Sequence, residues 1–382
     1  MSQADRADSW PPKTNSQREC PNQPSQREEK SQAPQPSDLP GGVTPSEVVD
    51  TLEADELPAG LAREPVAVRP GTSVREDVVV ARGEDAVWSS DTLTATNRWR
   101  AWHASYDGRW IEFEDPEGET VEIPLENSYS DAYAERYCAR NHDLERAVER
   151  EFDDPTTAMV TFTGSSGRPG NRPPLADHLR EVARGLSAAL GVLREALAGE
   201  RWVYVVAWEP HKSGYGHLHL GVFLDGVDAN AKAFKPVMDE HVENCKLAGY
   251  DAHHNSPCEK HAGEGVNDWD SADPECDDCD NPVSINDDVS GIGDYLTEYM
   301  GLYGADPLEA DPHVQTFYAA CWATGTQRVR YSVEANEMID REYRRRRREE
   351  LGFDPEDRGG DDGGNGGWTA TVAGRARVDP IS

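Results

Sequence analysis

Lysine and long apolar segments are scarce in this 382-residue sequence, and a nucleotide-binding loop is missing. Seven lysines stand beside 31 arginines, and no run of about 18 apolar residues could cross a membrane as a helix. The polar N-terminus lacks the apolar segment of a secretory signal peptide. The motif G-x-x-x-x-G-K-S/T is absent, which argues against an ATP-driven helicase within the chain. We therefore expect a cytoplasmic protein without membrane contacts.

Basic residues are outnumbered, with 72 acidic against 38 basic side chains and a net charge of −34. Such a balance ordinarily argues against nucleic-acid binding, because phosphate contacts depend on lysine and arginine. Excess carboxylates with little lysine are, however, typical of proteins from halophiles that accumulate salt. In about 1 M salt the Debye length is about 3 Å, so like charges hardly repel. The net charge therefore does not decide the ligand.

Cysteine is present in an odd number, seven, which favours a reducing compartment and thiols or metal ligands over a disulfide framework. Two pairs, Cys258-x₂-His261 and Cys276-x₂-Cys279, are separated by 14 residues, a spacing compatible with structural zinc. The alternative is a set of scattered thiols in a solvated acidic loop. Competing ligands in the same part of the sequence are Cys245, His253 and His254.

Composition divides the chain into five regions. The first is rich in proline, serine, glutamine and charge, which predicts disorder until about Val87. The last is rich in glycine and aspartate, which predicts a flexible tail. The expected regions are 1–85 (disordered), 86–155 (a hairpin at 109–125 and a helix at 130–152), 156–335 (the central domain, with a Cys/His insertion at 250–282), 336–355 (an arginine-rich helix) and 356–382 (the tail).

Hydrophobic periodicity predicts the order of elements in the central domain. Helical spacing over 174–199 leaves open one long helix or two with a break at Gly185 or Gly191. The order of strand, helix, two strands and helix predicts an α+β fold, a ferredoxin/RRM-like antiparallel sheet flanked by helices. The expected strands are 157–166, 201–210 and 216–226, and the other expected helices are 230–249 and 289–304.

His217 and His219 stand one residue apart in the expected strand 216–226. Residues i and i+2 of a strand share a face, so both imidazoles project together, while Leu218 and the alternate apolar residues project to the opposite face. The pair alone fits an ordinary strand as well as a metal site. Glu209, at the end of the preceding strand, would complete three ligands with open positions. The sequence therefore offers a candidate metal centre.

Tyr295 and Tyr299 have i, i+4 spacing in the expected helix 289–304, so both hydroxyls would emerge on one face. Two aromatic residues at this spacing also fit a stripe facing the core. A tyrosine phenolate can, on the other hand, act as a covalent nucleophile.

Three motifs in order resemble those of the HUH-type rolling-circle replication initiators, particularly those of plasmids and small viruses of halophilic archaea. They are "MVTFT" (159–163), "HLHLGVF" (217–223) and "YLTEY" (295–299). The third departs from many members, because Glu298 stands where they carry lysine.

The resemblance implies an HUH endonuclease core and a metal-dependent DNA nickase and strand transferase. Mg²⁺ or Mn²⁺ would be held by His217, His219 and Glu209, and Tyr295 and Tyr299 would be the catalytic residues. One tyrosine would attack single-stranded origin DNA, giving a 5′-phosphotyrosine and a free 3′-OH that primes a host polymerase, with a host helicase unwinding the duplex. Strand transfer through the second tyrosine would end the replication round.

Two rival functions remain at this point. A transposase or mobilisation relaxase of the HUH type shares the chemistry, and a non-catalytic DNA-binding regulator with a zinc-supported loop needs none of it. DNA contacts are expected from the arginine run 343–349 and from two arginines near Trp322 and Tyr331, aromatic residues that could stack on bases or lie in the core. The expected DNA-binding residues are Arg328, Arg330, Arg344, Arg345 and Arg346.

Overall fold

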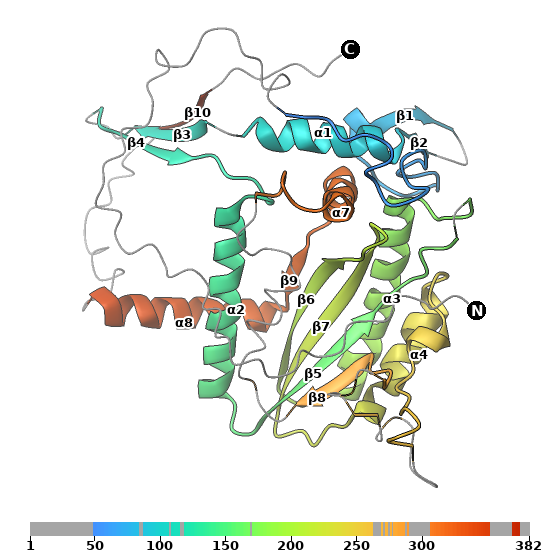
Figure 1. Cartoon of the computed structure of the whole chain (residues 1–382). Helices are drawn as coiled ribbons and strands as arrows, with labels where there is room; N and C mark the ends of the chain where they lie inside the picture. The colour runs from blue at the N-terminus through green and yellow to red at the C-terminus, as the bar shows by residue number, and fades with distance from the viewer. Residues whose placement is uncertain are drawn as a thin grey trace.

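The computed structural model (Figure 1) describes most of the chain from residue 49 onwards. The described residues are 49–351, without 84–86, 107, 115–117, 169, 263–268, 270–271, 274–275, 277, 287–288 and 290–305, together with a strand at 369–374. The expected helix 289–304, with Tyr295 and Tyr299, therefore lies almost entirely outside the described residues.

A five-stranded sheet lies at the centre of the molecule, and every neighbouring pair in it is antiparallel (Figure 1). Its order is β8 (Val283–Asn286), β5 (Pro155–Phe162), β7 (Gly216–Asp225), β6 (Trp202–Pro210) and β9 (Val329–Tyr331). The prediction of an α+β fold with an antiparallel sheet is confirmed, including the pairing of 201–210 with 216–226.

Helices cover both faces of this sheet, which explains why its strands are apolar on both sides. The residues of β7 alternate between two cores: Leu218 and Leu220 pack with α3 (Leu175–Ala196) and α7 (Pro312–Thr324), and Phe223 packs with α2 (Asp131–Glu151) and α8 (Val333–Leu351). Figure 1 shows α2 and α8 crossing on one side, with α3 and α4 (Lys235–Asn244) on the other. The face that carries the two histidines is therefore the α2/α8 face.

Helix α3 is continuous through both of its glycines, which resolves the alternatives left by the sequence. A Cβ atom at Gly185 would lie 2.3 Å from Nδ1 of His241 on α4. This glycine is thus needed for the close approach of α3 to α4, not for a break in the helix. At Gly191 an added Cβ would meet nothing within 4 Å.

Ordered structure begins earlier than the composition predicts. Leu61 and Val66 are buried in the main core, and Arg75 donates its backbone N–H to the carbonyl of Ala323 on α7. The expectation of disorder up to residue 85 is therefore wrong for residues 49–83, because a few apolar residues in a polar segment suffice to anchor it. A short hairpin joins β1 (Val79–Arg82) to β2 (Val87–Ser89), and residues 1–48 lie outside the described residues.

The accessory region contains the expected hairpin and helix. Strands β3 (Arg109–Glu114) and β4 (Thr120–Pro124) pair antiparallel, and α2 begins after Ser130, whose hydroxyl accepts the N–H of Tyr133. A third strand, β10 (Thr369–Gly374), joins β3, so the tail expected to be flexible contributes a strand. The remaining elements are α1 (Thr92–Ala104), which packs against α7, and the short helices η3 (Glu76–Val78), η4 (Ala231–Phe234) and η5 (Tyr250–Ala252). Of the helices described, none is long and apolar enough to cross a membrane.

Candidate functional site

The β6–β7 hairpin brings together the three residues that the sequence proposes as metal ligands. Glu209 on β6 lies directly opposite His217 on β7, and Ala207 lies opposite His219. Because side chains alternate across the pleat, Glu209, His217 and His219 emerge on the same face, next to the turn that joins the two strands.

Their ligand atoms converge on one point. Oε2 of Glu209 lies 2.8 Å from Nε2 of His217 and 2.6 Å from Nε2 of His219, and the two Nε2 atoms are 2.9 Å apart. The side chain of His219 is 5 % exposed and that of Glu209 is 20 % exposed, so the group opens toward solvent from a mostly buried base. Three good acceptor atoms crowded together in this way suit a bound cation.

Electrostatics keep the Glu209 carboxylate ionised. Burial alone would raise the pKa of this carboxyl, but the hydrogen bonds and charges of His217 and His219 outweigh burial and hold its pKa at about 2. The carboxylate is therefore available as a negatively charged ligand at neutral pH.

Thr161 orients His219 from the neighbouring strand. It lies opposite His219 in the β5–β7 pairing, and its Oγ1 lies 3.2 Å from Nδ1 of the imidazole. When Nδ1 carries the proton and donates it to this hydroxyl, the lone pair of Nε2 faces Glu209 and His217, as a metal ligand requires. The sequence analysis missed this residue, although it falls within the motif "MVTFT".

The donor set fits a divalent cation. One carboxylate oxygen and two imidazole nitrogens lie within 4.8 Å of one another, and a group of three ligands leaves positions for water or substrate oxygen atoms. Another histidine near this group, His211, meets the ring of His217 edge-on, at a centroid distance of 5.7 Å.

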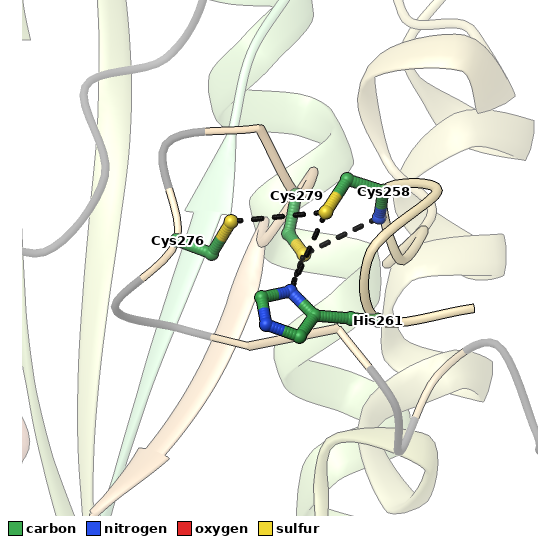
Figure 2. Close-up of side chains that lie close together, drawn as sticks. All are labelled: Cys258, His261, Cys276 and Cys279. Atoms are coloured by element: carbon green, nitrogen blue, oxygen red, sulfur yellow. Dashed lines mark hydrogen bonds between the residues drawn. The ribbon is translucent and has the colours of Figure 1, made fainter. Parts of the chain in front are cut away.

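A second group of ligand atoms lies in the Cys/His insertion, where Cys258, His261, Cys276 and Cys279 point toward one another (Figure 2). Sγ of Cys258 lies 3.8 Å from Sγ of Cys276, and Nδ1 of His261 lies 3.4 Å from the sulfur atoms of Cys258 and Cys279. The four residues therefore form a potential metal site. The three competing ligands named by the sequence do not join this group. His253 accepts the N–H of Thr163, His254 bonds to Ser256, and Cys245 is buried in the core.

Comparison with known proteins places the chain in a family. Residues 64–360 match the family described as "Putative rep protein (DUF1424)". The chain belongs to this Rep family. An "Uncharacterized 36 kDa protein" of Halobacterium salinarum is 35 % identical over 72 % of this chain and 85 % of its own length. A protein of the same name from Halobacterium sp. (strain GN101) is 34 % identical over 71 % and 83 %. No solved structure matches the chain.

The family match includes both groups of ligand atoms and all the arginines expected to bind DNA, but the structure places one of them, Arg328, in the core. Arg328 is 4 % exposed, and its guanidinium lies over the rings of Tyr129 and Tyr318 at 4.6 and 4.7 Å. Trp322 and Tyr331 are likewise core residues, so they do not present faces for base stacking. Arg328 therefore packs within a cluster of aromatic side chains in the core and is not exposed for contact with DNA.

The arginine run on α8 also serves packing. Both oxygen atoms of the buried Asp143 carboxylate on α2 accept hydrogen bonds from Arg346, at 2.7 and 3.0 Å. Arg345 pairs with the buried carboxylate of Glu342 and with Glu349. These two arginines are therefore paired with carboxylates of the protein. Arg330 and Arg344 are exposed.

Basic residues that the sequence analysis missed lie at the end of the sheet near the Glu209 group. The loop after β5, residues 163–174 and here called the basic loop, contains Arg168 and Arg172 and no acidic residue. Its end is held beside the start of β7, since Tyr215 Oη donates to the carbonyl of Pro173 at 2.6 Å. Lys212, in the β6–β7 turn, is exposed, as is Arg168, and neither pairs with a carboxylate in the described part of the chain. The absence of acidic residues from 163–174, in a sequence otherwise so acidic, could have indicated this basic loop from the sequence.

Proposed function

We propose that this member of the Rep family is an HUH-type replication initiator that nicks single-stranded origin DNA through a tyrosine. The observation that carries the proposal is the convergence of Glu209, His217 and His219 on one sheet face, beside the strand that bears the first motif. Membership of a Rep family supports replication and DNA as the context. The tyrosines of the third motif, Tyr295 and Tyr299, follow in the sequence but lie outside the described residues.

The ligands have separate tasks in this proposal. Glu209 supplies the negative charge, and the two histidines supply neutral nitrogen ligands whose directions are fixed by the strand and by Thr161. Mg²⁺ or Mn²⁺ bound there would polarise the scissile phosphate. The partly open side of the group leaves room for phosphate oxygen atoms, while the buried base keeps the ligands in place.

The reaction balances as a transesterification. A tyrosine oxygen forms a bond to phosphorus, the bond from phosphorus to the 3′ oxygen breaks, and the phenolic proton ends on that oxygen. The products are a 5′-phosphotyrosine and a 3′-OH primer, and the reverse attack by another 3′-OH transfers the strand. A host polymerase would extend the primer, and a host helicase would unwind the duplex.

The DNA strand would approach along the basic loop. Arg168 and Lys212 are exposed at the same end of the sheet as the Glu209 group, and two guanidinium nitrogens of Arg172, Nε and Nη1, are buried without a hydrogen-bond partner among the described residues. Arginine and lysine that are not neutralised within the protein suit phosphate oxygens. Arg330 and Arg344 remain candidates for DNA contacts farther from this site.

The Cys258 group has a different role in the proposal. Three thiolates and one imidazole make a closed set of four ligands, which is typical of structural Zn²⁺ and leaves no position for substrate. We therefore assign catalysis to the Glu209 group alone.

The experiment is a cleavage assay with overlapping single-stranded origin oligonucleotides in molar potassium chloride with Mn²⁺. The proposal predicts a nicked strand with the wild-type protein and at least a hundredfold slower cleavage with Glu209→Gln or His219→Gln, about the loss expected when a preorganised charge-stabilising group is removed. His142→Gln, a partly exposed histidine of α2, is the matched control and should cleave normally. DNA binding without cleavage of any strand would instead indicate a non-catalytic regulator.

A further inference from the structure

We propose that Cys258, His261, Cys276 and Cys279 bind one Zn²⁺, and that this ion fixes the edge strand β8, which pairs with the strand that carries Thr161. The zinc site and its effect on β8 stand independently of the proposed nickase activity. Only the consequence for the catalytic metal rests on that proposed function.

The distances between ligand atoms match a tetrahedral zinc site (Figure 2). With Zn–S bonds of about 2.3 Å and a Zn–N bond of about 2.0–2.1 Å, a tetrahedron has S···S edges of about 3.8 Å and S···N edges of about 3.6 Å. The Cys258–Cys276 sulfur distance is 3.8 Å, and the two S···N distances to His261 are 3.4 Å. A disulfide would instead bring its sulfur atoms to about 2.05 Å.

Hydrogen bonds around the group suit thiolate and imidazole ligands. Sγ of Cys279 accepts the backbone N–H groups of Cys258 and Asp273, each at 3.4 Å, which stabilises a negative sulfur. His261 turns Nδ1 to the sulfur atoms and places Nε2 3.4 Å from Oδ2 of Asp273. A carboxylate on the far nitrogen of a histidine ligand fixes its tautomer and strengthens it as a donor.

The two ends of the insertion are joined directly beside the ligands. Ser256 and Asp280 exchange both backbone hydrogen bonds at 2.9 Å, just before Cys258 and just after Cys279. The side chain of Asn255, which is 1 % exposed, donates to the carbonyl of Val283 at 2.7 Å and accepts its N–H at 3.1 Å. The ion would therefore close the loop between Ser256 and Asp280, and β8 begins directly after this loop.

Strand β8 in turn lies against the strand that orients His219. Val283 pairs with Val160 of β5, and the carbonyl of Pro282 accepts the backbone N–H of Thr161 at 2.8 Å. The hydroxyl of the same Thr161 bonds to His219. Short stretches of backbone and the hydrogen bonds between them thus link the Cys/His group, through Pro282 directly before β8 and through Thr161, to the candidate catalytic metal centre.

Composition explains why this segment needs an ion. The insertion is rich in aspartate and glutamate and poor in large apolar residues, so apart from Trp269, which packs in the main core, it has little apolar surface to bury. Zinc binding supplies folding free energy directly to such segments. Removing the ion should therefore release β8 while the remaining strands keep their pairing.

The first test measures zinc in purified full-length protein, without DNA. We expect one Zn²⁺ per chain in the wild type, its loss in Cys258→Ser and His261→Gln, and about 10–100-fold weaker zinc binding in Asp273→Asn. His254→Gln, which changes a neighbouring histidine of the insertion that bonds to Ser256 and contacts the ring of Trp269, should retain full zinc. Absence of zinc from the wild type, even after incubation with excess Zn²⁺, would overturn the proposal, as would equal loss in His254→Gln.

The second test avoids variants that fail to fold. Wild-type protein is stripped with a chelator, returned to Zn²⁺ or left without it, and examined by hydrogen exchange and Mn²⁺ titration. We expect faster exchange over residues 281–286, little change in β6 and β7, and Mn²⁺ binding weakened about tenfold or more until Zn²⁺ is restored. Unchanged exchange over 281–286 would refute the role of zinc in fixing β8. Because neither test uses DNA, a failure of the nickase proposal would leave these results standing.

Discussion

Replacing Thr161 with valine removes the hydroxyl that bonds to Nδ1 of His219, and with it the acceptor that the metal-binding tautomer needs, with almost no change in volume. In the buried surroundings of His219, Nδ1–H would lose its partner, and the tautomer with the proton on Nε2 would become competitive. That tautomer points a proton at the bound metal, so metal affinity falls. Loss of such an outer hydrogen bond weakens metal binding about 10–100-fold. At 3.2 Å the bond is at the long end of the usual range, which favours the lower value, about tenfold or about 1.4 kcal/mol.

The assay is Mn²⁺ titration of wild type and variants by electron paramagnetic resonance or calorimetry in molar potassium chloride. Thr157→Val makes the same change on the same strand, where the hydroxyl bonds to the carbonyl of Asn286, and should bind Mn²⁺ normally. Thr161→Ser, which keeps the hydroxyl, should restore most of the affinity. The reasoning is refuted if Thr161→Val binds Mn²⁺ as tightly as the wild type, or if Thr157→Val loses as much.

Three further predictions concern DNA binding and stability. Arg168→Gln should reduce the slope of log affinity for single-stranded DNA against log salt by about 0.7, one phosphate contact, whereas Arg194→Gln, exposed at the far end of α3, should not change it. Gly185→Ala should destabilise the protein by about 1–3 kcal/mol in denaturant titrations, because the new Cβ would lie 2.3 Å from Nδ1 of His241 on α4. Gly191→Ala has open space around it and should stabilise the protein by about 0.5–1 kcal/mol. Burial would raise the pKa of Glu342, but hydrogen bonds from two arginines hold this pKa below its ordinary value. Glu342→Gln should therefore lower the free energy of unfolding by about 1.5–3 kcal/mol at pH 7. The difference between variant and wild type should shrink as the pH falls through the carboxyl range, because the wild type then loses the same stabilisation.

The parts of the site that follow from local periodicity could be predicted from the sequence. Strand alternation places His217 and His219 on one face, and the short turn between the two strands places Glu209 opposite His217. The spacing of Cys258, His261 and the later cysteine pair likewise indicates a four-ligand group. In each case the relevant residues are close in sequence or joined by a hairpin.

Contacts between distant segments could not be predicted in this way. Arg328 is drawn into the core by Tyr129, about 200 residues earlier, and Arg346 by Asp143 on a helix equally far away. A sequence pattern shows that an arginine is charged but does not show which side chain it contacts in the fold. An arginine that packs inside the protein therefore looks the same in the sequence as one that binds DNA. The early start of ordered structure at residues such as Leu61 was missed for the same reason, because its core neighbours lie far along the chain.

The central claim, tyrosine-dependent nicking at the Glu209 group, is tested most directly by mapping the covalent protein–DNA product. Wild-type protein is incubated with cleavable single-stranded origin DNA and Mn²⁺, the DNA is trimmed with nuclease, and peptides are examined by mass spectrometry. We expect a nucleotide attached through phosphate to Tyr295 or Tyr299, with no adduct in the double phenylalanine variant or in His219→Gln. An adduct on another residue, or cleavage that persists in the double variant, would contradict the central claim.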